Sequence, residues 1–87
     1  MIRDGPETAA LAALTDLVAT ARVHRAAAIA DGRYGTAQTF DALAQHLDRV
    51  RTRLTEEHGV FLAEAWGYVD AGRLTIARHL ATTRRRA

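Results

Sequence analysis

The segment from Phe40 to Leu54 places the strongest constraint on the fold. Its large apolar residues are separated alternately by three and four positions: Phe40, Leu43, Leu47, Val50 and Leu54. This spacing is typical of a helix that buries one narrow seam against other helices. Asp48 and Arg51, which stand between seam positions, are expected to pair on the exposed side of the same helix. We therefore predict an amphipathic helix whose five apolar residues form a core or oligomer seam.

The composition favours helix along the whole chain. Hydrophobic residues make up 48% of the 87 residues but aromatic residues only 6%, and alanine, the best helix former, supplies many of the rest. The single proline, Pro6, lies too near the start to break a later helix. We predict an all-α single domain over residues 1–87, either an antiparallel three-helix bundle or a helical hairpin plus a third helix.

A first helix is predicted from Pro6 to Asp31. Either Asp4 or Gly5 can cap its start, with Pro6 in or next to the first helical position, and Gly32 suits the left-handed residue that follows a helix end. Its apolar face is expected at Leu11, Leu14, Leu17, Val18, Ala21, Ala28 and Ile29. Because alanine also lies on its other sides, this helix could be contacted from two directions.

The second helix is predicted to span Ala37 to Glu57. A four-residue connection, Gly32 to Gly35, precedes it, and Thr36 is the candidate N-cap. A loop this short makes two long helices antiparallel neighbours.

The third helix is predicted from Val60 to Thr82. Gly67 and Gly72 interrupt its pattern, and each costs about 1 kcal/mol relative to alanine inside a helix. We favour one helix, weakened or bent at Gly72, over two shorter ones. Trp66 is expected to be the largest core anchor and to join the seam.

Charge is distributed unevenly. Residues 1–70 carry seven arginines and ten acidic residues, whereas residues 71–87 carry five arginines and no acidic residue. Residues 83–87 are expected to form a frayed basic tail. Such an end can contact phosphates of a nucleic acid, another anion or an acidic protein surface, or it can simply complement a helix dipole. The candidate contact residues are Arg73, Arg78, Arg84, Arg85 and Arg86.

A helix-turn-helix motif fits the sequence poorly. Ala63 and Gly67 can occupy its small-residue and turn positions, but Arg73 then falls where a buried aliphatic residue is required.

The residue inventory argues against catalysis and cofactor binding. The chain contains no Cys, Lys, Ser or Asn, which excludes disulfides, serine nucleophiles and lysine chemistry. No acidic residue stands three positions before any histidine, so the helical metal-binding pattern is absent and we expect no metal or other cofactor. His46 and His58 are expected to be exposed, and His24 and His79 to flank the seam.

No run of 18 apolar residues is present, and the N-terminal residues do not resemble a signal peptide, so we expect no membrane association and a cytoplasmic location. A chain of this size buries only about 60–65% of the surface that its unfolded form exposes, so a lone core is marginal. We therefore expect a dimer of identical chains. We expect the function to be that of a non-enzymatic protein-interaction or regulatory module that binds another protein. The alternative is a small DNA-binding regulator that uses the basic C-terminal end.

Overall fold

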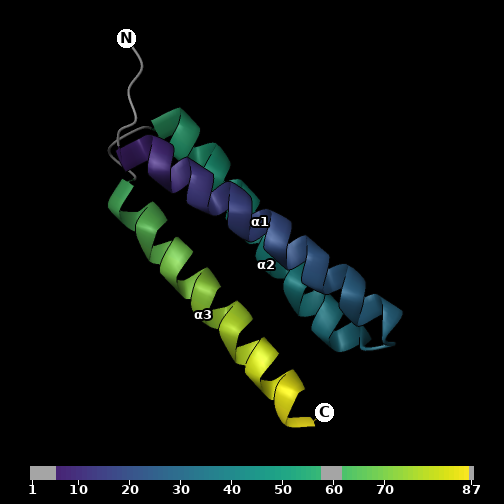
Figure 1. Ribbon diagram of the computed structural model, residues 1–87. Helices are drawn as coiled ribbons and strands as arrows, with labels where there is room; N and C mark the ends of the chain where they lie inside the picture. Colours follow the sequence, from purple (N-terminus) through teal and green to yellow (C-terminus); the bar gives the residue numbers. More distant parts are fainter. Residues whose placement is uncertain (1–5, 58–61, 87) are drawn as a thin grey trace.

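Three helices account for nearly all of the residues that the structure describes (Figure 1). The structure is a computed structural model that describes residues 6–57 and 62–86, with side chains for residues 7–56 and 62–82. The helices are α1 (Pro6–Ala30), α2 (Tyr34–Glu57) and α3 (Leu62–Arg86). In Figure 1, α2 runs back along α1, and α3 runs in the same direction as α1. The prediction of an all-α fold with three helices is confirmed.

The turn between α1 and α2 is a compact helix-ending motif. The Arg33 amide donates to the Ala28 carbonyl at 2.8 Å, and the Gly32 amide donates to the Ile29 carbonyl at 3.0 Å. These two bonds define a Schellman motif, in which the residue after the helix adopts a left-handed conformation. Gly32 has a φ of 73°, which confirms its predicted place just past the end of the first helix.

The second helix begins three residues earlier than predicted. The Arg33 carbonyl accepts the Ala37 amide at 3.0 Å, so Arg33 is the N-cap residue and Thr36 lies inside the first turn. Arg33 therefore belongs both to the capping motif at the end of α1 and to the N-cap of α2. Because one residue serves both ends, the connection needs only residues 31–33, and the predicted Thr36 cap is wrong.

The core lies between all three helices. Phe40, Leu47, Val50 and Leu54 of α2 are buried, and Leu43 is half-buried against them. The other helices contribute mainly aliphatic and small side chains to the same cluster: Ala10, Leu14, Leu17, Val18 and Ala21 from α1, and Ala65, Val69 and Ile76 from α3. The chain thus buries one continuous apolar interior without a buried polar or charged side chain among the described residues.

The third helix is continuous, as predicted. Its predicted start at Val60 lies outside the described residues, and its helical backbone extends past the predicted end at Thr82 to Arg86. Fraying of residues 83–87 stays a prediction, because their side chains lie outside the described part of the chain. Trp66 is only half-buried at the edge of the core, so the expectation that it is the largest core anchor is wrong. The largest fully buried side chains are Leu14, Leu47, Leu54 and Val69.

Gly72 is buried where α3 faces the α1–α2 hairpin. A Cβ atom at this position would be 3.3 Å from Leu47 Cδ1 and 3.5 Å from Leu17 Cδ1. Gly67, one and a half turns earlier, has nothing within 4 Å of the same hypothetical atom. The two glycines of α3 therefore have different roles: Gly72 makes room for its neighbours, and Gly67 does not.

We predict opposite effects of substitution at these two glycines. Gly72→Val forces two methyl groups against Leu47 and Leu17, and should lower the free energy of unfolding by about 1–3 kcal/mol. Gly67→Ala, at the glycine of α3 that has no close neighbour, should raise it by about 0.5–1 kcal/mol, because alanine favours helix and meets no other side chain there. Urea denaturation followed by circular dichroism measures both. A Gly72→Val variant as stable as the original chain would contradict this packing.

Candidate interaction surfaces

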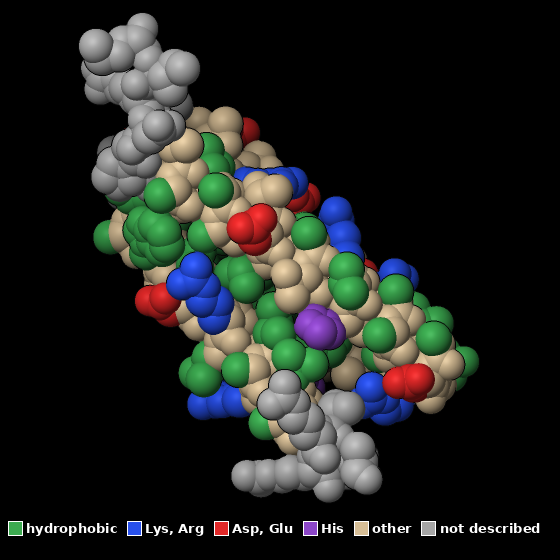
Figure 2. Space-filling model, in the orientation of Figure 1, with side chains coloured by type: hydrophobic (Ala, Val, Ile, Leu, Met, Phe, Trp, Pro, Cys, Tyr) green, Lys and Arg blue, Asp and Glu red, His purple; other side chains and the backbone are tan. Residues whose placement is uncertain are grey.

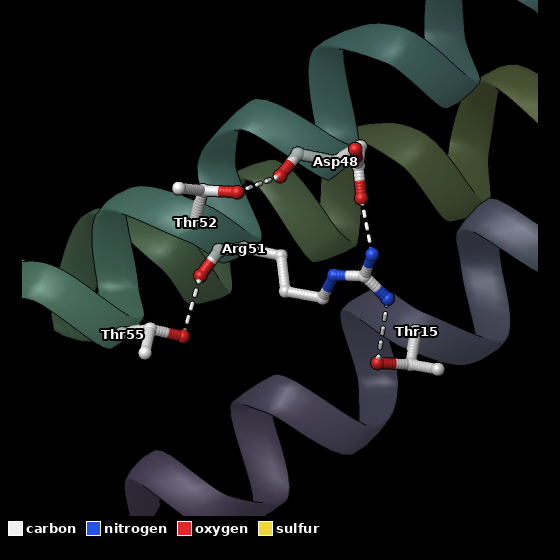
Figure 3. Close-up of polar contacts among 5 residues, drawn as sticks. All are labelled: Thr15, Asp48, Arg51, Thr52 and Thr55. Atoms are coloured by element: carbon white, nitrogen blue, oxygen red, sulfur yellow. Dashed lines mark hydrogen bonds and ion pairs between the residues drawn. The ribbon is translucent and has the colours of Figure 1, made fainter.

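The polar contacts between α1 and α2 are structural. Arg51 donates to Thr15 Oγ1 across the two helices at 3.3 Å and pairs with Asp48 on its own helix (Figure 3). This confirms the predicted pairing of Asp48 with Arg51. The hydroxyls of Thr52 and Thr55 donate to main-chain carbonyls one turn earlier, both at 3.1 Å. These contacts either join α1 to α2 or lie along α2 at the surface of the bundle.

The described histidines pack against aromatic rings. The rings of His24 and His79 lie 5.4 Å and 5.3 Å, centroid to centroid, from Phe40. Both are half-buried, so they flank the seam as expected, and the exposed His46 meets the edge of Tyr68 at 5.0 Å. His58 lies outside the described residues. Within the described ranges, no cluster of three or more His, Asp or Glu side chains is close enough to hold a metal ion.

The side of α1 that faces away from the core carries a second row of residues at helical spacing. Its members are separated by four and three positions in turn and are all exposed: Ala12, Asp16, Ala19, Val23, Ala26 and Ala30. We call this row the α1 outer face. Val23 is 66% exposed, and Asp16 is the one charged member. Figure 2 shows small hydrophobic side chains spread along α1 on the side in view.

The outward side of α3 has a similar composition. Its exposed residues recur with the same spacing, and we call them the α3 outer face: Ala63, Gly67, Asp70, Leu74, Ala77 and Ala81. Leu74 is 51% exposed at its centre. Each of the two outer faces therefore has one large aliphatic side chain exposed among mainly small residues, Val23 on α1 and Leu74 on α3.

A shallow pocket of about 200 Å³ lies beside the turn between α1 and α2. We call it the turn-end pocket; it is lined by Arg25 and Ile29 from α1 and by Tyr34, Ala37, Gln38 and Asp41 from α2. Tyr34 is 65% exposed and Ile29 is 39% exposed. This pocket was not predicted from the sequence. Arg25 and Asp41 lie side by side because of the position and length of the turn between α1 and α2, and the sequence prediction placed the start of α2 three residues too late.

The predicted basic residues lie apart from the seam. Arg73 and Arg78 are exposed on α3, and Arg73 Nη1 lies 4.0 Å from Asp70 Oδ1. The side chains of Arg84, Arg85 and Arg86 lie outside the described residues. The seam residues, by contrast, are inside the core or half-buried at its edge, where they hold the helices together.

Comparison of the chain with protein-family models, with curated proteins and with solved structures finds no match. In the described part of the chain, none of the helices has both the length and the apolar character that spanning a bilayer requires.

Proposed function

We propose that the protein is a non-enzymatic interaction module of the cytoplasm that pairs with a second copy of itself through the α1 outer face. The observation that supports this proposal is the exposure of Val23 in the middle of a regularly spaced row of small residues. Small side chains allow a neighbouring helix to approach closely, and helix axes in such contacts are about 8–10 Å apart.

Burial of Val23 in such a contact would stabilise the dimer. Removing a side chain of this kind from water contributes about 1.5–3 kcal/mol, and a two-fold symmetric pair buries it twice. Small domains with a limited core commonly gain stability in this way. The complex would leave the ends of the bundle and α3 free for another protein.

The α1 outer face is a better self-complementary surface than the α3 outer face. Leu74 is flanked by two arginines, Arg73 and Arg78, whereas Val23 is next to Arg22 alone, so a two-fold contact through α3 would bring more like charges from the two copies together. Among the residues whose side chains are described, Arg73 lies 4.0 Å from the carboxylate of Asp70, a long contact that offsets little of this repulsion.

This proposal predicts a dimer that depends on Val23. Sedimentation velocity at high micromolar concentration should give the mass of two chains. Val23→Glu should weaken association by at least about tenfold, because a carboxylate would be buried without a partner. Leu74→Glu, a matched change on α3, should leave the dimer intact, and circular dichroism should show both variants helical. A monomer mass for the original chain across the concentration range would contradict the proposal.

The alternative function is a small DNA-binding regulator that uses the basic C-terminal end. It is supported by the helical backbone of α3, which extends through Arg86 and so places the last arginines on the same helix as Arg73 and Arg78. Arginine side chains on a regular helix are a common means of contacting DNA phosphates.

Salt-dependent binding to random duplex DNA separates the two functions. The interaction-module proposal predicts no measurable binding at physiological salt. The alternative predicts that log affinity falls linearly with log salt, with a slope reduced by about 0.9 for each phosphate contact removed. Fluorescence anisotropy of the original chain and an Arg84→Ala, Arg85→Ala, Arg86→Ala triple variant measures this. A steep slope that the triple variant flattens would favour the DNA-binding function.

A further inference from the structure

We infer that the turn-end pocket binds a small carboxylate that carries a compact apolar group. The pocket brings the half-exposed guanidinium of Arg25 beside two exposed hydrophobic side chains, Ile29 and Tyr34. These are the two kinds of contact that such a ligand needs. None of the pocket residues belongs to the α1 outer face, so this inference does not depend on self-association.

Polar contacts at the surface place the Arg25 guanidinium beside Asp41. Gln45 Nε2 donates to Asp41 Oδ2 at 3.0 Å, and Asp41 Oδ1 lies 3.3 Å from Arg25 Nε. Both oxygens of Asp41 are therefore engaged, and the guanidinium contacts Asp41 through Nε. A guanidinium has five N–H donors in a rigid plane, and no described residue accepts from the Nη atoms of Arg25. That edge can bind a second carboxylate through two parallel hydrogen bonds.

The apolar group of the ligand would contact Ile29 and Tyr34, the exposed hydrophobic side chains of the pocket. Ile29 is 39% exposed and Tyr34 is 65% exposed, and the buried Ala37 lies between the two helices in the same pocket. The volume of about 200 Å³ is smaller than the roughly 300–1,000 Å³ that is typical of ligand pockets. This is room for one side-chain-sized group.

The end of α1 at Ala30 and the start of α2 at Tyr34 meet beside the pocket, and their opposite partial charges offset each other, so Arg25 is the group that selects an anion. The first turn of α2 carries no acidic residue. Asp41 is the one acidic residue that lines the pocket, and Arg25 and Gln45 already use both of its oxygens.

An amide NMR titration of the full chain with 4-methylpentanoate tests the inference. Saturable shift changes should appear around residues 25–41, with a dissociation constant in the millimolar range. The primary amide of the same acid should bind at least about fivefold more weakly, because it lacks the charge that Arg25 recognises.

Two variants and one control locate the site. Arg25→Gln should weaken binding of the acid about fivefold or more while leaving the weak binding of the amide unchanged, and Tyr34→Ala should weaken both ligands. Arg22→Gln, which removes an exposed arginine one turn earlier and outside the pocket, should change neither by more than about twofold. Circular dichroism checks that each variant stays helical. Equal binding of acid and amide, equal losses in the Arg25 and Arg22 variants, or no saturable shift would overturn the inference.

The source of the carboxylate is settled by a second pair of ligands. A short peptide ending in leucine is compared with its C-terminally amidated form in the same titration. If the free-ended peptide binds more tightly than 4-methylpentanoate, the site recognises a peptide end, and if the simple acid binds more tightly, it recognises a free acid. If the amidated peptide binds as well as the free-ended one, the carboxylate is not recognised and the inference fails.

Discussion

At Gly72, α3 packs against the α1–α2 hairpin with no room for a large side chain, because a Cβ atom there would already touch Leu47 Cδ1 at 3.3 Å and Leu17 Cδ1 at 3.5 Å. A side chain much larger than a methyl group at this position would push α3 away from both leucines. With α3 in place, Val69 and Ile76 join the apolar cluster formed by the first two helices. A residue that is unfavourable inside an isolated helix is thus tolerated in α3, because tertiary packing outweighs its intrinsic cost.

Features set by the geometry of a single helix were predictable from the sequence. The alternating spacing from Phe40 to Leu54 identified the buried side of α2, since residues three and four apart lie on one face of a helix. Gly32 was identified as the end of α1 for a similarly local reason. The start of α2 was missed because Arg33 serves as the end of one helix and the cap of the next, and two glycines three apart suggested a longer loop.

Features that depend on the distance between helices were not predictable in the same way. Gly72 looked like a weak point in a helix, because the periodicity of one helix does not say how closely another approaches it. The turn-end pocket was missed for the same reason. The abundance of alanine around α1 did indicate contacts on two sides, and the structure shows that the core uses one of them. The exposed row centred on Val23 is the side that the proposed dimer would cover.

The most direct test of the three-helix account is a set of nuclear Overhauser effects at Gly72. In a dilute, isotope-labelled sample, the Gly72 α-protons should show cross-peaks to the methyl groups of both Leu47 and Leu17, because these atoms come within van der Waals contact of α3. Isotope-filtered spectra should assign the cross-peaks to contacts within one chain. Absence of both contacts, with α3 still helical, would show that α3 does not pack on the hairpin in this way and would contradict the account.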